Sequence, residues 1–161
     1  MPRCSVTMIT RLDHPQRGVA LLDYPLSYVN AKTVFETMEA GRADRYHRKS
    51  FDYWMGAHSI QERFHSFKKS YKGGKYTNCF TFKDIGAKER FYGFLWHPQS
   101  RARYELCVLV RFVQKKEDAQ DLTELNRVGE VRNLSDVQAA CDDPRLFIRN
   151  HEGRGVGRNY D

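Results

Sequence analysis

The pattern of hydrophobic and polar positions predicts a β-sheet in the middle of the chain. Three runs rich in β-branched and aromatic residues follow one another there, separated by short turn sequences. They are NCFTFKDI (residues 78–85), KERFYGFLWHP (88–98) and RYELCVLVRFVQKK (103–116). The third run is almost continuously apolar, which is typical of a central strand covered on both faces. The short connections favour an antiparallel meander, because parallel strands need long crossovers.

Outside this sheet, the same pattern predicts one more strand and several helices. The strand covers residues 18–24, and whether residues 5–10 form another stays open. Apolar residues at helical spacing predict helices over residues 31–40, 42–55, 59–69, 117–128 and 135–141, with Asn30 as an N-cap and capping boxes beginning at Ser59 and Ser135. Residues 146–148 are a possible last strand.

These elements predict a single α+β domain over residues 1–161. Its expected architecture is a small antiparallel sheet covered by N-terminal helices and followed by a C-terminal helix. The chain is 40% hydrophobic, which is enough for an ordinary globular core at this length. An N-terminal extension (about residues 1–17) and a basic C-terminal tail (about residues 145–161) are expected at its ends.

The charge balance points to an anionic partner. Lys and Arg number 27 against 20 Asp and Glu, giving a formal charge of +7 and an isoelectric point near 9.3. No run approaches the ~20 apolar residues of a membrane span, and no basic helix has a clean apolar face, so nucleic acid is favoured over a membrane. The four cysteines are widely spaced without a C-x-x-C pair, which together with the absence of a secretory leader predicts a cytoplasmic protein.

One basic loop combines charge with backbone freedom. The sequence KKSYKGGKY (residues 68–76) places four lysines, including Lys72 and Lys75, around two glycines and two tyrosines. Flexible backbone, positive charge and stackable rings are the ingredients of a nucleic-acid contact loop, although short basic loops are also common on ordinary surfaces. The same two interpretations, a phosphate-binding face or a solvated helix surface, apply to the basic residues of segment 42–55.

Two segments resemble strands of the RelE/ParE/HigB-type toxins. KERFYGFL (88–95) resembles their arginine-led strand, and CVLVRFVQKK (107–116) resembles their next strand, which ends in lysines; the likeness covers roughly residues 71–132. The resemblance implies a RelE-like fold and metal-independent cleavage of messenger RNA on the ribosome, with a cognate antitoxin protein as partner. In that reaction the ribose 2′-hydroxyl attacks the adjacent phosphate, and the enzyme stabilises charge and moves protons.

The resemblance also implies roles for individual residues. Arg90 would bind the phosphate oxygens, with Lys116 and secondarily Lys115 as a second basic contact. Lys83 and Arg111, on the neighbouring strands, would bind the RNA. His97 is the candidate acid or base because its ordinary pKa is near 6.5, and Tyr92, which shares a sheet face with Arg90, would stack a base or orient the phosphate. The alternatives are a turn histidine without a catalytic role and a packing tyrosine.

Two other functional classes stay open. The chain could bind without cleaving, as a RelE/ParE-fold inhibitor or a nucleic-acid-binding protein, or it could be a basic α+β domain unrelated to toxins. Convergence of Arg90, Lys83 and Lys116 with an acid or base in one patch would favour an enzyme, whereas their dispersal would favour a binder. The histidines follow no metal-ligand spacing and no Walker-type loop occurs, so no metal and no other cofactor is expected.

Overall fold

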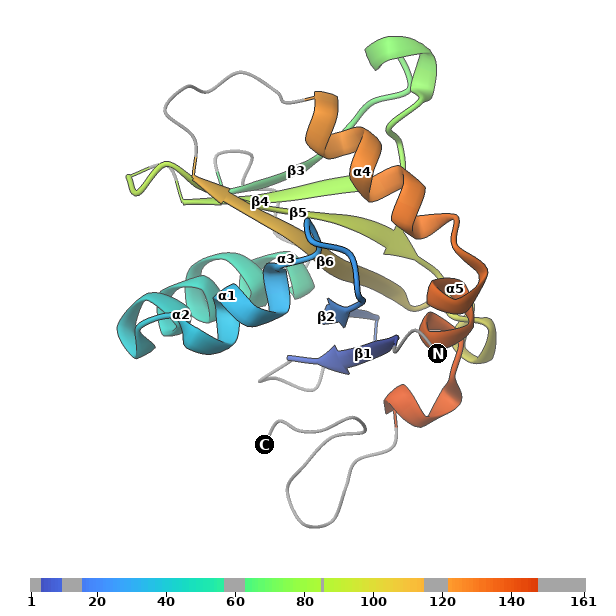
Figure 1. Cartoon of the computed structure of the whole chain (residues 1–161), viewed down its shortest axis with the longest axis horizontal. Helices are drawn as coiled ribbons and strands as arrows, with labels where there is room; N and C mark the ends of the chain where they lie inside the picture. Colours follow the sequence, from blue (N-terminus) through green and yellow to red (C-terminus); the bar gives the residue numbers. More distant parts are fainter. Residues whose placement is uncertain (1–3, 10–15, 57–62, 85, 115–121, 148–161) are drawn as a thin grey trace.

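The protein forms one mixed sheet with helices on both faces (Figure 1). The computed structural model describes residues 4–9, 16–56, 63–84, 86–114 and 122–147. The strands are β1 (Ser5–Met8), β2 (Arg17–Asp23), β3 (Phe64–Ser66), β4 (Cys79–Asp84), β5 (Glu89–Trp96) and β6 (Glu105–Gln114). Within the described residues, the spatial order of the six strands is β1-β2-β6-β5-β4-β3. The predicted meander is therefore confirmed as β4, β5 and β6, each antiparallel to the next.

The predicted fold class was wrong in the size of the sheet and in the placement of the helices. β2 pairs with β6 in parallel, and β1, which lies in the predicted N-terminal extension, pairs with β2 as an edge strand. Residues 24–104, which include the first helices, β3, β4 and β5, connect β2 to β6 and give the long crossover that a parallel pair requires. These pairings join distant parts of the chain, so the local pattern that defines each strand did not contain them.

The first helical layer packs against one face through aromatic side chains. It contains α1 (Ala31–Thr37), α2 (Ala40–Tyr46), a π-helical turn (His47–Phe51) and α3 (Asp52–Met55). Phe35, Phe51 and Phe91 lie at the centre of this layer, with ring centroids 5.8–6.5 Å apart. Asn30 occupies the predicted N-cap position of α1, but its side chain makes no capping hydrogen bond and instead exchanges two hydrogen bonds with the backbone of Phe112. That exchange fixes the start of the helix to the central strand.

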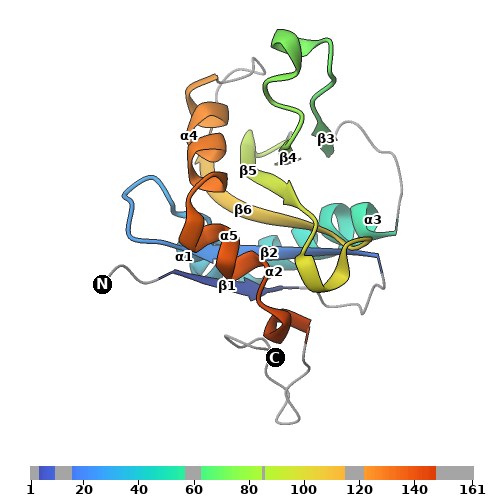
Figure 2. The same ribbon diagram turned by 90° about the vertical axis from the view of Figure 1, so that its right-hand side faces the viewer.

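The second layer covers the opposite face. It contains α4 (Leu122–Arg132) and α5 (Ser135–Cys141), followed by a 3₁₀ turn (Pro144–Phe147), and Figure 2 shows α4 lying across the sheet from the other side. Leu125, Val128 and Val131 repeat at helical spacing and are fully buried against the sheet. The predicted helix over residues 117–128 is thus found as α4, with residues 115–121 outside the described part of the chain.

Three local predictions were wrong. The helix expected over residues 59–69 is replaced, where it is described, by β3, because Phe64 pairs with Phe82 at the sheet edge. Residues 146–147 belong to a 3₁₀ turn instead of a strand, and residue 148 lies outside the described residues. The capping box at Ser135 does not form, since Leu134 is the N-cap and the Gln138 side chain donates to the Arg132 carbonyl. The capping box at Ser59 lies outside the described residues.

Candidate nucleic-acid interface

Four of the residues predicted to form the site are cross-strand neighbours. Lys83 pairs with Arg90, and Tyr92 pairs with Arg111, next to a bulge that shifts the β5–β6 register. Tyr92 packs in the core cluster that contains the apolar residues of α4, and alternation along β5 places Arg90 on the same face. These four residues therefore lie in one region of the sheet.

This region is closed by the helix that covers it. Tyr92 is fully buried and Arg90 is only 4% exposed. Arg111 donates from Nε to Oε1 of Glu124 on α4 at 3.0 Å, and Glu124 also pairs with Arg127. A polymer cannot reach groups that lie between a sheet and a helix. Tyr92 and Arg111 therefore support the packing of α4, and the outer surface must supply any contact with a macromolecule.

His97 does not join this cluster. It follows the far end of β5, seven residues from Arg90, and at about 3.3 Å per residue the separation is about 23 Å. Its Nδ1 lies 2.9 Å from the carbonyl oxygen of Tyr104. Lys115 and Lys116 lie outside the described residues. The structure thus brings Arg90, Lys83, Tyr92 and Arg111 together and leaves the predicted acid or base apart from them.

The predicted basic loop forms a defined turn between β3 and β4. We call residues 68–76 the lysine loop. Lys72, Gly73 and Gly74 all have positive φ, a left-handed conformation that glycine adopts without strain. Two buried aromatic side chains anchor the two ends of the loop in the core. Phe67 lies just before its start, and Tyr76 at its end donates from its hydroxyl to Oδ1 of Asn126 at 2.8 Å. The backbone of the lysine loop is therefore held in place by contacts with the core.

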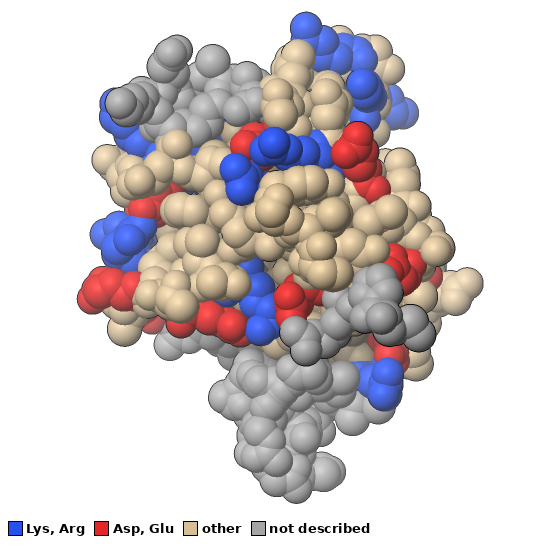
Figure 3. All heavy atoms as spheres, in the orientation of Figure 1, with Lys and Arg blue, Asp and Glu red and all other residues tan. Residues whose placement is uncertain are grey.

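The lysines of this loop point outward. Lys68, Lys69, Lys72 and Lys75 are all exposed. Figure 3 shows Lys and Arg side chains gathering over this end of the molecule, where Figure 1 places the loop. Within the described residues, none of the four forms an ion pair with a carboxylate, and the ammonium groups of Lys72 and Lys75 lie 6.0 and 5.6 Å from the tyrosine rings beside them. Their charge is therefore available to an external anion.

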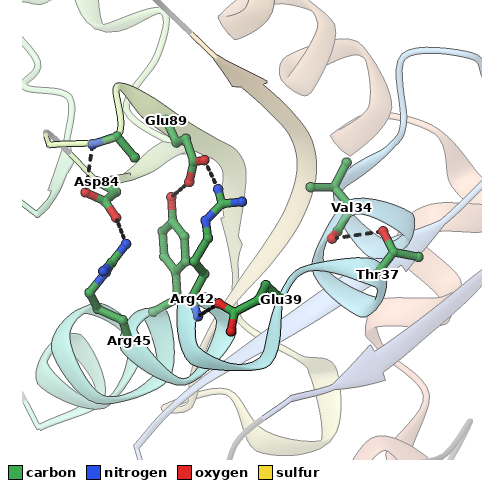
Figure 4. Close-up of polar contacts among 9 residues, drawn as sticks. Val34, Thr37, Glu39, Arg42, Arg45, Asp84 and Glu89 are labelled. Atoms are coloured by element: carbon green, nitrogen blue, oxygen red, sulfur yellow. Dashed lines mark hydrogen bonds and ion pairs between the residues drawn. The ribbon is translucent and has the colours of Figure 1, made fainter.

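A second basic surface lies at the other end of β4. Arg45, Lys49, Arg63, Lys83 and Asp84 line a hollow of about 570 Å³ beside the β4–β5 turn. In Figure 4, Arg45 of α2 points to Asp84, with an N–O distance of 2.9 Å, and the backbone N–H of Ala87 donates to the other Asp84 oxygen at 3.2 Å. Four cations thus surround one carboxylate, and the hollow is positive.

A buried carboxylate lies across the strand pair from Asp84, beside this hollow. Glu89 is 3% exposed; its Oε2 pairs with Arg42 and its Oε1 accepts from the Tyr46 hydroxyl at 3.0 Å (Figure 4). Burial raises the pKa of Tyr46, so that the phenol remains a donor at neutral pH. Glu39 caps α2 by accepting from the Arg42 backbone N–H. The local sequence pattern did not reveal this network. Arg42 and Tyr46 lie 43 or more residues from Glu89 in the chain, and Glu39 at the start of α2 carried no recognised capping signal.

A polar pocket, also absent from the sequence prediction, lies between the lysine loop and α4. Its volume is about 500 Å³, and its lining includes Lys75, Asn78, Asn126, Gly129, Arg132 and Asn133. We call it the asparagine pocket. Gly129 lies within α4, where glycine costs up to about 1 kcal/mol relative to alanine. The sequence signal was this glycine, one position beyond the helix predicted over residues 117–128, but nothing in the sequence links it to the asparagines.

The described residues offer neither a nucleophilic thiol nor a metal centre. Burial raises the pKa of Cys79 to about 11, and burial likewise raises the pKa values of the other three cysteines. In the described ranges, no group of three or more His, Cys, Asp or Glu side chains could hold a metal ion. No helix there is long and apolar enough to cross a membrane.

Comparison with known proteins gives no relative. No protein-family model, curated protein or solved structure matches the chain. The resemblance to the RelE/ParE/HigB-type toxins therefore stays a prediction from short segments. The function is therefore inferred from the charged and polar groups of the exposed surface.

Proposed function

We propose that this protein binds nucleic acid through the lysine loop. The proposal is supported by the four exposed lysines of the loop. The backbone that presents them is anchored in the core by the buried side chains of Phe67 and Tyr76. A fixed row of ammonium groups replaces counterions along a phosphate backbone, and a fastened loop loses little conformational entropy on binding. Both properties favour a polyanion over a small neutral ligand.

The edge of the sheet extends this surface. β3 is an edge strand; Arg63, which lines the basic hollow, precedes it, and the lysine loop follows it. The five residue-to-residue steps from Arg63 to Lys68 span about 17 Å in extended form. A nucleic-acid strand lying along β3 would therefore meet cations at both ends of that path.

Binding without catalysis is the function that the geometry favours. Tyr92 is buried beneath α4, Arg90 is only 4% exposed, and His97 lies about 23 Å away from Arg90 along β5. The presumed acid, base and phosphate contacts thus do not share one open surface. Cleavage of messenger RNA on the ribosome and neutralisation by an antitoxin stay predictions from the sequence resemblance.

The first test removes part of the lysine loop. The variant Lys68→Gln/Lys69→Gln/Lys72→Gln is expected to bind a fluorescent single-stranded RNA about 100-fold more weakly than wild type at about 0.1 M salt, because three phosphate contacts are lost. Lys75 is kept because it also lines the asparagine pocket. Fluorescence anisotropy gives both dissociation constants.

A matched control removes three cations elsewhere. Lys32→Gln/Arg103→Gln/Arg145→Gln has the same net charge as the loop variant, and two of its positions already pair with Glu36 and Asp143. It is expected to bind within about twofold of wild type. Equal affinities of the two variants for the RNA would contradict the proposal. New RNA fragments in the wild-type samples would support the enzyme prediction instead.

A further inference from the structure

We propose that the asparagine pocket receives one unpaired base of a single-stranded nucleic acid whose backbone the lysine loop holds. This inference rests on the proposed function and adds the ligand class. Lys75 belongs to the loop and also lines the pocket, so a strand held by the loop passes the pocket opening. The volume of about 500 Å³ lies within the range of about 300–1,000 Å³ that is common for small-molecule sites.

The polar groups of the pocket match the edge of a base. Each asparagine amide presents a donor beside an acceptor, and base edges carry the complementary pattern. Among the described residues, the side chains of Asn78 and Asn133 form no hydrogen bond. Asn126 accepts from the Tyr76 hydroxyl through Oδ1, which leaves its amide N–H₂ group as a donor. In a duplex the Watson–Crick edges are paired, so an unpaired base fits this set of groups.

The remaining lining favours a base over a phosphate. Arg132 is fixed, with its Nε donating to the Leu95 carbonyl at 3.1 Å and its guanidinium 4.9 Å over the Trp96 ring. Glu130 offsets part of the positive charge, and buried Leu125 and the Cys79 thiol supply an apolar wall. A phosphate site would concentrate cations, whereas a base needs amides and an apolar surface.

Gly129 keeps space open in this pocket. A Cβ at position 129 would meet no atom within 4 Å, so the packing of α4 against its neighbours does not demand a glycine there. A larger side chain would enter the pocket without disturbing the core. Position 129 thus allows the pocket to be filled while every polar group and charge is kept.

The test uses Gly129→Leu, with Ala139→Leu on the exposed surface of α5 as the matched control. Anisotropy is measured with short single-stranded oligomers of A, C and U, the DNA oligomer of the preferred base, and an RNA duplex. Wild type is expected to discriminate among the three RNA oligomers by about tenfold. Gly129→Leu is expected to lose about tenfold on the preferred oligomer, to bind the three alike and to keep its duplex affinity, whereas the control matches wild type.

The outcomes separate this inference from the proposed function. Wild-type affinities and base preference in Gly129→Leu would overturn the base pocket, while the lysine-loop variant would still report on binding itself. A loss confined to RNA, with the DNA oligomer unaffected, would also overturn the base as the ligand. Circular dichroism and thermal unfolding of Gly129→Leu are expected to show an intact fold, because leucine favours a helix more than glycine does.

Discussion

Replacing Glu89 with alanine is expected to lower the free energy of unfolding by about 3 kcal/mol. The carboxylate is 3% exposed and accepts from Tyr46 while pairing with Arg42. Without it, the Tyr46 hydroxyl loses its acceptor in the core, and the absent side chain leaves a cavity. Arg42 is 39% exposed and can regain water, which keeps the loss near the lower end of the range for broken buried pairs.

Urea unfolding followed by circular dichroism measures this loss. Glu36→Ala is the matched control, because Glu36 is 51% exposed and, among the residues that the structure describes, pairs only with Lys32 on the same helix. Its expected effect is about 0.5 kcal/mol or less. If the two alanine variants unfolded at the same urea concentration, the Glu89 network would not contribute to the fold as described.

Replacing Gly93 with alanine is expected to destabilise the protein by about 3 kcal/mol and to lower the melting temperature by about 6–12 °C. Gly93 lies beside the β5–β6 bulge, and a Cβ there would lie 2.4 Å from the carbonyl oxygen of Val108. Because the contact is with strand backbone, no side-chain rotation relieves it. The two central strands would have to separate locally.

Gly129→Ala, the same substitution at a position with free space around it, is expected to stabilise the protein. Nothing lies within 4 Å of a Cβ at that helical position, so alanine is expected to raise the free energy of unfolding by about 0.5–1 kcal/mol. Scanning calorimetry of both variants measures the two shifts. A Gly93→Ala variant as stable as wild type would contradict the close approach of β5 and β6.

The sequence predicted elements whose pattern is local. β4, β5 and β6 carried their own alternation and turn signals, and α5 was found at residues 135–141, although the capping box from which it was predicted does not form. β3 was mistaken for a helix, since a short aromatic segment fits both periods and its pairing with β4 decides the outcome. The parallel β2–β6 pair joins residues more than 80 positions apart, which no local pattern describes.

In the candidate site, too, the sequence predicted features that depend on neighbouring residues but not those that depend on long-range packing. Alternation correctly placed Arg90 and Tyr92 on one face, yet it did not reveal that both are buried and that Tyr92 packs with the apolar residues of α4. The lysine loop was recognisable because its charges and glycines are adjacent in the sequence. Asn78, Asn126 and Asn133 meet only through the packing of α4 beside the loop, so the pocket became visible only in three dimensions.

The most direct test of nucleic-acid binding by the lysine loop is the salt dependence of affinity. The logarithm of the binding constant for single-stranded RNA, plotted against the logarithm of salt concentration, loses about 0.7 in slope for each phosphate contact removed. The Lys68→Gln/Lys69→Gln/Lys72→Gln variant is therefore expected to show a slope shallower than that of wild type by about 2. Parallel lines for the two proteins would show that the loop does not contact the backbone and would contradict the proposed function.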